Sequence, residues 1–202
     1  MLRVEQLKIG SMPPLTFSVP AGECLAVEGP SGIGKSRLLR AIADLDPADG
    51  YVYLNGKERL EMPADQWRAK VRYVSAEPGW WADTAREHLP ETPRVAALSA
   101  ALGLEPRHLD QPISELSTGE RLRLALIRAI ADEPEALLLD EPTASLDDGS
   151  ARAVEALIRA ETQAGRRVII VSHNLGEIER LAHQRLLLAS PTQPAQPAGV
   201  RA

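Results

Sequence analysis

The stretch "GPSGIGKS", from Gly29 to Ser36, decides how the rest of this 202-residue chain is interpreted. It matches the pattern G-x-x-x-x-G-K-[ST] and follows an apolar run, "CLAVE", that predicts a strand. It also opens a segment in which Leu38, Ile42 and Leu45 share one helical face. The alternative is a glycine-rich turn with a surface lysine. The strand, loop and helix in this order favour a loop whose backbone N–H groups curl around phosphate oxygens at a helix N-terminus.

Two side chains of this loop carry the predicted chemistry. The Lys35 ammonium group is expected to reach the β- and γ-phosphates of a nucleotide, and the Ser36 hydroxyl is expected to bind Mg²⁺. The pattern indicates nucleotide binding without indicating what the energy is used for. The candidate nucleotide-contacting residues here are Gly29, Pro30, Ser31, Gly32, Ile33, Gly34, Lys35, Ser36 and Arg37.

Two adjacent carboxylates follow a second apolar run. "ALLLDEP" places Asp140 and Glu141 at the end of a predicted strand. The alternative is an ordinary acidic loop, because strand ends are often polar. Together with a phosphate loop, the pair is expected to divide its work: Asp140 supports the Mg²⁺ shell, and Glu141 acts as general base on the attacking water.

The remaining runs place these motifs in an α/β chain. Strands are predicted at "LRVEQLKI", "LTFSV", "CLAVE", "YVYL", "VRYVS", "ALLLD", "RRVIIVS" and "RLLLA". Helices are predicted at "KSRLLRAIADL", residues 83–104, residues 118–132, "SARAVEALIRAETQAG" and "LGEIERLA". The N-terminal runs, with a hairpin turn at Asn55-Gly56, predict a small antiparallel sheet. Apolar strands alternate with helices in the second half and are therefore expected to be buried and parallel.

Two segments are expected to stand apart from this layer. Residues 78–130 hold predicted helices and no strands, which indicates a separate helical lobe. Residues 190–202, "SPTQPAQPAGVRA", are rich in Pro, Ala and Gln and are expected to form a disordered tail. The main domain is thus predicted to span residues 1–189.

Composition narrows the class of protein. A net charge of −5 argues against a general nucleic-acid binder. Within "RLRLALIR", Arg121 and Arg128 are expected to form the solvated side of a helix. The single cysteine, Cys24, permits no intrachain disulfide and is expected to be a buried apolar residue. No window approaches the roughly 20 apolar residues that span a bilayer, and the N-terminus lacks the pattern of a secretion signal.

The segment "LSTGERLRLAL", from Leu116, begins the strongest predicted helix. Ser117 and Glu120 have the spacing of a capping box, which explains a serine before the helix. It explains less well Gly119 in the first turn, where glycine has poor helix propensity. A glycine at that place permits close approach of another surface or a ligand.

Taken in order, these motifs resemble the nucleotide-binding domain of ATP-binding cassette (ABC) proteins. "LSTGER" resembles the family signature, LSGGQ followed by a basic residue, "GPSGIGKS" resembles the Walker A loop, and "LLLDEP" resembles Walker B. "SLDD", from Ser145 to Asp148, resembles the D-loop, and "VSHN" places His173 at the position of the switch histidine. The resemblance covers residues 1–188. It implies a P-loop NTPase with a RecA-like parallel-sheet core, a small N-terminal antiparallel β subdomain and an inserted helical lobe.

The resemblance also implies a mechanism and partners. ATP and Mg²⁺ would bind between two domains clasped head to tail, and Ser117 and Gly119 of one domain would face the γ-phosphate held by the other. Glu141, His173 and Lys35 would be catalytic, and Ser36 and Asp140 would bind the metal. The chain would be the ATP-hydrolysing subunit of a transporter on the cytoplasmic face of the membrane, working with a separately encoded membrane-spanning subunit. The alternative is a soluble ABC ATPase that acts on nucleic acid or ribosomes.

The chain departs from the family pattern in three respects, one of which is that the helical lobe between Ala76 and Ser117 is short for the family. In "YVSAEP", Ala76 stands where the family has a glutamine, so Mg²⁺ coordination is expected to be weaker unless Glu77 or water substitutes. The family also stacks an N-terminal aromatic residue on adenine, whereas "LKIGSMPP" offers only Ile9 or Met12. Modest ATP affinity and weak discrimination among bases are therefore expected.

The turn "EPGWWADT" holds two of the three tryptophans, Trp80 and Trp81. By the resemblance, this segment enters the helical lobe and borders the cleft that receives the membrane partner, and tryptophan is a frequent interface anchor. The alternative is that both rings fill the core. At least one ring is expected to be exposed and to contact the partner. "SAEPGWWADT" and the compact length also resemble small transport ATPases of the bacterial iron-efflux type.

Overall fold

The computed structural model describes residues 1–189 and 197–198 of the chain. The disordered tail predicted for residues 190–202 lies outside the described residues, apart from Pro197 and Ala198. These two residues form a short strand, β10, that pairs antiparallel with β9. No helix in the described part of the chain is long and apolar enough to span a membrane.

The N-terminal region forms an antiparallel sheet with the strand order β2-β1-β4-β5. Its strands are β1 (Leu2–Lys8), β2 (Leu15–Val19), β4 (Asp49–Leu54) and β5 (Lys57–Glu58). Asn55 and Gly56 both have positive φ, 51° and 84°, as the predicted hairpin turn requires. The prediction of a small antiparallel subdomain is confirmed.

The second sheet has the strand order β10-β9-β3-β8-β7-β6, and its strands from β9 to β6 run parallel. These five strands are β9 (Gln184–Leu187), β3 (Cys24–Glu28), β8 (Arg167–Val171), β7 (Ala136–Asp140) and β6 (Val71–Val74). Strands β7 and β3 lie inside the sheet and are apolar, which fits strands covered on both faces. The α/β prediction with a parallel core is confirmed.

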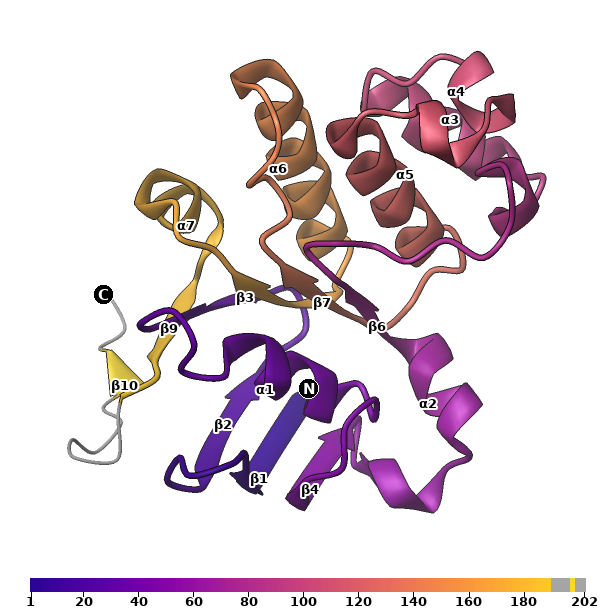
Figure 1. Ribbon diagram of the computed structural model, residues 1–202. Coiled ribbons are helices and arrows are strands. Elements are labelled where there is room, and N and C mark those ends of the chain that lie inside the picture. Colours follow the sequence, from indigo (N-terminus) through magenta and orange to yellow (C-terminus); the bar gives the residue numbers. More distant parts are fainter. Residues whose placement is uncertain (190–196, 199–202) are drawn as a thin grey trace.

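Helices cover both faces of the parallel sheet (Figure 1). Helix α1 lies on the face that the N-terminal sheet also covers, while α5, α6 and α7 lie on the opposite face. The helices are α1 (Lys35–Ile42), α2 (Ala64–Lys70), α3 (Pro93–Ala101), α4 (Arg107–Asp110), α5 (Thr118–Ile130), α6 (Asp148–Gln163) and α7 (Leu175–Leu181).

The two faces of the sheet correspond to two hydrophobic clusters. Trp67, on a helix that sequence patterns did not predict, is fully buried in the cluster beside α1, and its indole N–H donates to the Ile42 carbonyl at 2.9 Å. Cys24 is buried as predicted, and burial raises the pKa of its thiol to about 12. Sequence patterns gave no indication of this buried aromatic side chain, because Trp67 lies in a short helix among charged residues.

The helical lobe, formed by α3, α4 and α5, differs from its prediction in one respect. Residues 83–104 were expected to be one helical segment, but α3 begins only at Pro93, after a three-residue 3-10 turn at Arg86–His88. The proline fixes φ for the first turn, and the Thr92 hydroxyl caps the helix by accepting from the Val95 N–H. Pro90 and Pro93 lack backbone N–H donors, so a continuous helix through them is disfavoured.

Candidate nucleotide-binding and hydrolysis site

The loop from Gly29 to Ser36 connects the end of β3 to the start of α1. Gly34 caps α1 in a left-handed conformation (φ 109°), which glycine adopts without strain. A Cβ at Gly29 would lie 2.8 Å from the Leu188 carbonyl oxygen, so this position admits no side chain. Lys35 is nearly buried, and its ammonium group donates to the Gly29 and Pro30 carbonyls at 2.8 and 3.1 Å. The lysine therefore points back into the loop that it is predicted to serve.

The two predicted carboxylates lie next to each other but in different surroundings. Asp140 is the last residue of β7 and is 5% exposed. Glu141 follows it with φ 52°, a conformation uncommon outside glycine, and its N–H donates to the Val171 carbonyl at the end of β8. This turn directs the Glu141 carboxylate toward His173, which donates to it from the backbone N–H at 3.4 Å. The His173 imidazole Nε2 also lies 3.4 Å from a Glu141 oxygen.

These groups surround one cleft of about 580 Å³ between the phosphate loop and the ends of the central strands. Its lining residues are Ser31, Gly32, Gly34, Lys35, Ser36, Arg37, Ala76, Asp140, Glu141, Ala144, Val171 and His173. Of the other predicted loop residues, Gly29 and Pro30 lie behind it as acceptors for Lys35, and Ile33 packs on the core. Ser117 and Gly119 do not line this cleft.

The cleft has a contact that sequence patterns did not predict. The Tyr73 hydroxyl, on β6, donates to Asp140 Oδ2 at 3.1 Å. Burial, followed by the charge of Asp140, raises the pKa of Tyr73 to about 12, so the hydroxyl keeps its proton at neutral pH. The sequence offered only "VRYVS" as a strand, with no motif around the tyrosine.

Near Glu141 and His173, a buried carboxyl group joins two segments. Glu177, on α7, is fully buried and accepts from the Thr143 hydroxyl at 2.9 Å. Burial raises the pKa of Glu177 above its usual value. The segment after β7, which carries Glu141, is thereby tied to the helix that follows His173.

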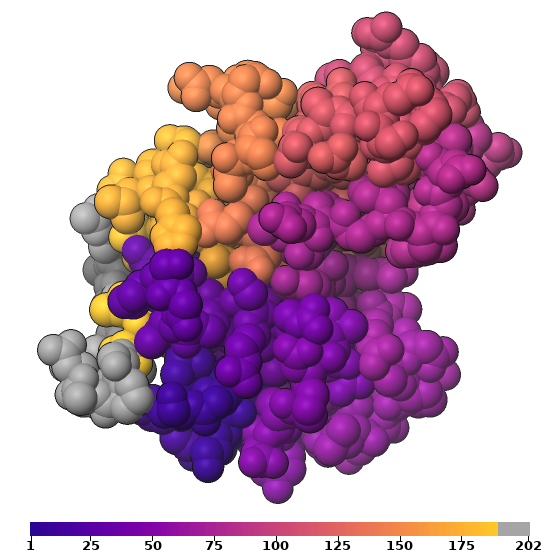
Figure 2. All heavy atoms as spheres, in the orientation of Figure 1, coloured from indigo at the N-terminus to yellow at the C-terminus, as the bar shows by residue number. Residues whose placement is uncertain are grey.

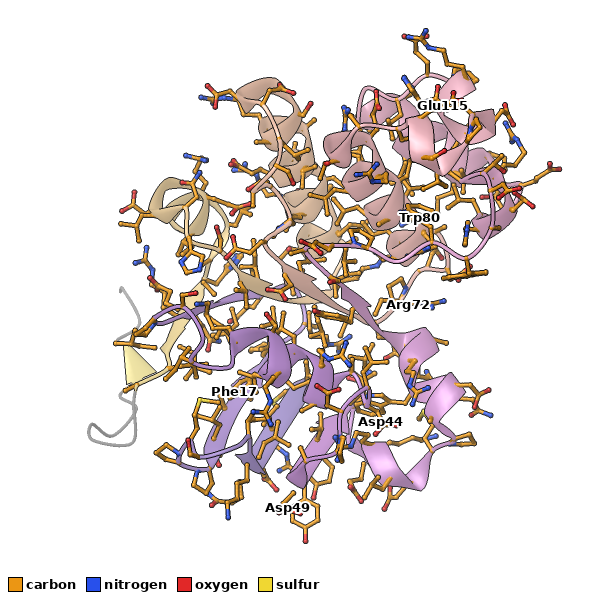
Figure 3. The ribbon with its side chains drawn as sticks, viewed as in Figure 1. Phe17, Asp44, Asp49, Arg72, Trp80 and Glu115 are labelled. Atoms are coloured by element: carbon orange, nitrogen blue, oxygen red, sulfur yellow. The ribbon has the colours of Figure 1, made fainter. Side chains whose placement is uncertain are left out.

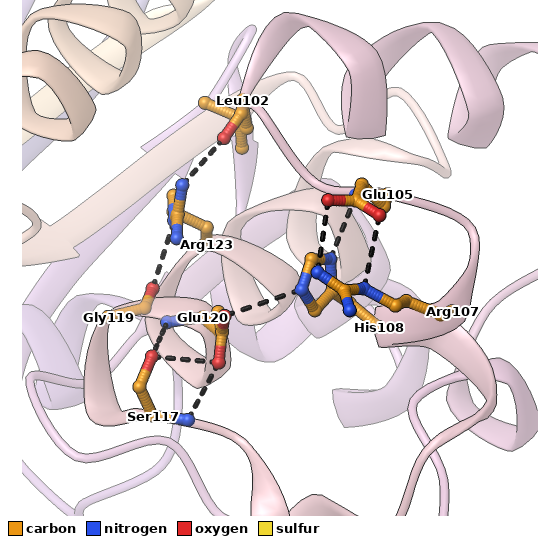
Figure 4. Close-up of polar contacts among 8 residues, drawn as sticks. All are labelled: Leu102, Glu105, Arg107, His108, Ser117, Gly119, Glu120 and Arg123. Atoms are coloured by element: carbon orange, nitrogen blue, oxygen red, sulfur yellow. Dashed lines mark hydrogen bonds and ion pairs between the residues drawn. The ribbon is translucent and has the colours of Figure 1, made fainter.

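The predicted signature helix α5 begins with the expected capping box (Figure 4). The Ser117 hydroxyl accepts from the Glu120 N–H at 3.2 Å and donates to the Glu120 carboxylate at 2.8 Å, which also accepts from the Ser117 N–H at 2.8 Å. These bonds lower the pKa of Glu120, the bond from the Ser117 backbone most of all. His108 Nε2 lies 3.4 Å from the second Glu120 oxygen and completes the support.

Gly119 is packed within its own chain. A Cβ there would lie 3.0 Å from the Leu146 side chain and 3.5 Å from the Ser145 carbonyl oxygen, both of the predicted D-loop. The close approach expected of this glycine is therefore made by the D-loop segment.

The departures from the family pattern also have structural counterparts. Ala76 lines the cleft with a methyl group only, while Glu77 is exposed and is not among the lining residues. Ile9 and Met12 are 5% and 6% exposed, and Met12 packs beneath the phosphate loop at Gly34. Because both side chains are nearly buried, they offer little surface to a base.

A second hollow, of about 650 Å³, lies between β6, the segment after it and α5. Trp80 is half-buried against the helical-lobe core, and Trp81 is 78% exposed. Figure 3 places Trp80 beside α5 and Arg72 below it on β6. The Arg128 guanidinium lies 4.4 Å from the Trp80 ring centroid and 4.9 Å from that of Trp81. We refer to this hollow as the tryptophan groove.

The prediction that Arg121 and Arg128 form the solvated side of a helix was wrong for Arg128. Arg121 donates to the Leu116 carbonyl at 2.6 Å and so supports the start of its own helix. Arg128 donates to the Gly79 carbonyl at 3.1 Å, and burial lowers its pKa. Both contacts form with residues outside the helix, which helical periodicity does not reveal.

The fold and the cleft together define a class of protein. A phosphate loop, two carboxylates and a histidine converge at the carboxyl ends of parallel strands, and a helical lobe carries a separate capped helix. This arrangement is that of a P-loop ATPase of the cassette type.

Comparison with known proteins gives the family. A family model described as "ABC transporter" matches residues 12–144. The chain belongs to this family, as its ATP-binding, ATP-hydrolysing cassette. A solved structure of an ATP-binding subunit of an ABC transporter has a TM-score of 0.84 at 25% identity, covering 93% of this chain and 85% of that one. A dimeric ATP-binding cassette bound to ADP and Pi shares the fold, with a TM-score of 0.83, 22% identity and 98% of each chain covered.

Curated relatives agree with this assignment. Protein STAR1 of Oryza sativa subsp. japonica is 36% identical over 186 residues, 86% of this chain and 54% of the rice protein. ABC transporter I family member 17 of Arabidopsis thaliana is 32% identical over 180 residues, 83% of this chain and 68% of the relative. A phosphate import ATP-binding protein of Colwellia psychrerythraea (strain 34H / ATCC BAA-681) is 34% identical over 194 residues, 84% and 69% of the two chains. The chain thus spans about half the length of the rice protein and about two thirds of the other two.

Proposed function

We propose that the chain hydrolyses ATP·Mg²⁺ in a head-to-tail dimer and thereby powers transport through a separate membrane-spanning subunit. The observation that carries this proposal is the convergence of Lys35, Glu141 and His173 on one cleft that lacks the signature residues. The proposed cassette spans residues 1–189, with its helical lobe at about 78–130. It works at the cytoplasmic face of the membrane, held there by its partner.

The proposed roles follow from the surroundings of each group. Glu141 is the general base, because its carboxylate faces the cleft and can accept a proton from water. His173, within 3.4 Å of that carboxylate, orients it and contacts the γ-phosphate. Lys35 turns from the Gly29 and Pro30 carbonyls to the β- and γ-phosphates when nucleotide enters the loop.

The donors of the cleft fit Mg²⁺. The Ser36 hydroxyl and the Asp140 carboxylate line the same cleft, and Mg²⁺ prefers hard oxygen ligands of this kind. It is usually held by one or two protein groups together with substrate phosphates and water, so two protein oxygens suffice. When bound, the metal neutralises charge on the β- and γ-phosphates.

A second cassette completes the site. Ser117 and Gly119 lie outside the cleft of their own chain, at the start of α5. The N-terminus of α5, where Ser117 is exposed, suits a phosphate group supplied by another copy. One homodimer or one pair of related subunits therefore holds two ATP molecules.

The tryptophan groove is the proposed contact for the membrane subunit. Trp81 exposes most of its ring, and exposed aromatic side chains often anchor interfaces. Two buried nitrogen atoms beside the groove, Trp80 Nε1 and His88 Nδ1, have no hydrogen-bond partner in the described part of the chain. His88 Nε2 accepts from the Ala82 N–H at 3.1 Å, so its proton resides on Nδ1.

The arginine side chains of the tryptophan groove indicate the charge of the partner segment that would bind there. Arg72 is paired with Asp132 at 2.7 Å. Arg128 forms no ion pair within the described residues; its guanidinium donates to the Gly79 carbonyl and lies over the two tryptophan rings. A desolvated guanidinium beside two unused donors favours a partner that brings acceptors. We therefore expect the docking segment to carry an acidic side chain.

The substrate is not assigned by the chain, because specificity lies in the membrane subunit. The Colwellia relative is named for phosphate import. The iron-efflux type suggested by "SAEPGWWADT" stays a proposal, and efflux assays in cells that overproduce the pair would test it. The alternative, a soluble ABC ATPase acting on nucleic acid or ribosomes, is disfavoured by the net charge of −5.

Glu141→Gln tests the proposed hydrolysis. The glutamine keeps the size of the side chain but cannot accept the proton, so ATP binding should persist while turnover falls by at least about a hundredfold. A closed dimer should accumulate with ATP, because hydrolysis is what opens it. Gel filtration with ATP and Mg²⁺, together with phosphate release, measures both. Wild-type turnover by this variant would overturn the role of Glu141.

A further inference from the structure

Strand pairing places Tyr73 beside the metal-binding carboxylate. In the parallel register of β6 and β7, Tyr73 lies opposite Leu138, two residues before Asp140. Residues two apart on a strand share a face, so the Tyr73 and Asp140 side chains extend from the same face of the sheet. The Tyr73 hydroxyl donates to Asp140 Oδ2 at 3.1 Å, which leaves Oδ1 of the carboxylate for the cleft.

The Asp140 carboxylate has little other support. In residues 1–189, the Tyr73 hydroxyl is the one side-chain donor within hydrogen-bond distance of it. Ala76, the second residue after β6, presents only a methyl group to the cleft. A carboxylate that is 5% exposed and held by a single hydrogen bond depends on that bond for its orientation.

We propose that Tyr73 is a positioning residue that holds Asp140 in the orientation in which Oδ1 faces Mg²⁺. The inference rests on the proposed role of Asp140 as a metal ligand. By donating to Oδ2, the hydroxyl fixes the orientation of the Asp140 carboxylate and leaves Oδ1 free to face the metal.

A packing role for Tyr73 would leave a different signature. The ring packs, half-buried, against the cluster that includes Leu38 and Leu39. Phenylalanine would preserve that packing and remove only the hydroxyl. If packing is the whole role, Tyr73→Phe should change neither metal binding nor stability.

The experiment measures metal binding without turnover. In a Glu141→Gln background saturated with ATP, Mn²⁺ binding is followed by electron paramagnetic resonance, ATP affinity is measured in EDTA, and the melting temperature is recorded. Tyr73→Phe should weaken Mn²⁺ binding by roughly tenfold or more, the loss of one hydrogen bond to a charged group, and leave ATP affinity in EDTA unchanged. The melting temperature should fall slightly, because the nearly buried Asp140 carboxylate loses its hydrogen-bond donor. Tyr51→Phe is the matched control, because it removes an exposed tyrosine hydroxyl of the N-terminal sheet.

Asp140→Asn distinguishes a failure of the role proposed for Tyr73 from a failure of the proposed metal site. If Asp140→Asn weakens Mn²⁺ binding and Tyr73→Phe does not, the role of Tyr73 is overturned while the metal site stands. If Asp140→Asn leaves Mn²⁺ binding intact, the proposed metal site itself fails, and the role of Tyr73 with it. If Tyr73→Phe lowers ATP affinity in EDTA as much as it lowers Mn²⁺ affinity, the tyrosine is a structural residue and the proposal is overturned.

Discussion

At the scale of single residues, two side chains of the same chemical type lie in different surroundings in the candidate site. Asp140 and Glu141 are both carboxylates, but one ends a buried strand and the other occupies a left-handed turn beside His173. Two neighbouring residues come from one short stretch of the chain: Tyr73 lies on β6, and Ala76 follows two residues after the end of that strand. The hydroxyl of the first and the missing amide of the second are expected to set how firmly the metal is held.

Ala76→Gln tests the second of these expectations. Because Ala76 lines the cleft, a glutamine there would bring a carbonyl oxygen to the metal or to its water. The Mg²⁺ concentration for half-maximal ATP hydrolysis should fall. The expected decrease is roughly fivefold if the glutamine adds a contact worth one ordinary hydrogen bond. A titration of phosphate release against Mg²⁺ measures it.

Glu77→Ala is the matched control for this titration. Glu77 is exposed and does not line the cleft, so its removal should leave the Mg²⁺ requirement unchanged. A nucleotide-bound structure with the Glu77 carboxylate on the metal would contradict the assignment of weak coordination to Ala76.

At the scale of elements, the start of α5 combines a tight cap with a tight contact. The capping box uses the hydroxyl of Ser117 and the carboxylate of Glu120, and the second residue of the helix, Gly119, packs against the D-loop segment. A side chain larger than hydrogen at that place would displace Leu146. The position of the signature relative to the D-loop is thus set by contacts inside one chain.

Gly119→Ala should separate folding from dimerisation. Alanine has the better helix propensity by about 1 kcal/mol, which offsets the shift of Leu146 needed to admit a Cβ at 3.0 Å. The melting temperature of the nucleotide-free chain should therefore change little. The ATP-driven dimer, formed in the Glu141→Gln background, should weaken, because the added methyl group would shift Leu146 and the D-loop segment beside the surface proposed to face the γ-phosphate.

Gly176→Ala provides the comparison. Gly176 is also the second residue of its helix, α7, and a Cβ there would meet Arg180 at 3.0 Å. It should match Gly119→Ala in stability and dimerise like the parent chain in gel filtration. Equal dimerisation of the two variants would remove Gly119 from the proposed interface.

At the scale of the whole molecule, the segment from β6 to Ala76 contributes to both hollows. Strand β6 lines the tryptophan groove, which opens toward α5, and Ala76 lines the cleft proposed to hold nucleotide. Figure 2 shows the helical lobe standing apart from the N-terminal part of the molecule, with the surface hollowed between them. A partner in the groove would therefore contact the segment that leads from β6 past Ala76.

Two tryptophan variants should distinguish docking from folding. Trp81→Ala should weaken assembly with the co-purifying membrane subunit by roughly thirtyfold, which corresponds to about 2 kcal/mol, and leave ATP binding unchanged. Trp67→Ala should instead cost about 3–5 kcal/mol of folding stability and reduce every activity, because its ring is fully buried. Chemical denaturation and detergent-solubilised pull-downs measure the two effects. Unfolding of Trp81→Ala, or its unchanged assembly, would contradict the docking role.

The sequence by itself determined the parts whose chemistry is local. The phosphate loop is one contiguous stretch with fixed spacing, and the strands and helices around it follow from apolar periodicity and from turn residues such as Asn55 and Gly56. Order along the chain then sufficed to assign the family. The capping box of Ser117 and Glu120 was also readable, because its two partners stand three residues apart.

Only the tertiary structure decided which distant side chains meet. The Tyr73 hydroxyl reaches Asp140 across 67 positions of sequence, and Arg128 reaches Gly79 across 49, so no periodicity within a helix or strand reveals either contact. Trp67 is buried because α2 packs on the core, although charged residues surround it in sequence. These contacts depend on strand register and on helix packing, which the whole fold sets. For that reason, a tyrosine in an unremarkable strand and an arginine on a presumed outer face became the most informative residues near the two hollows.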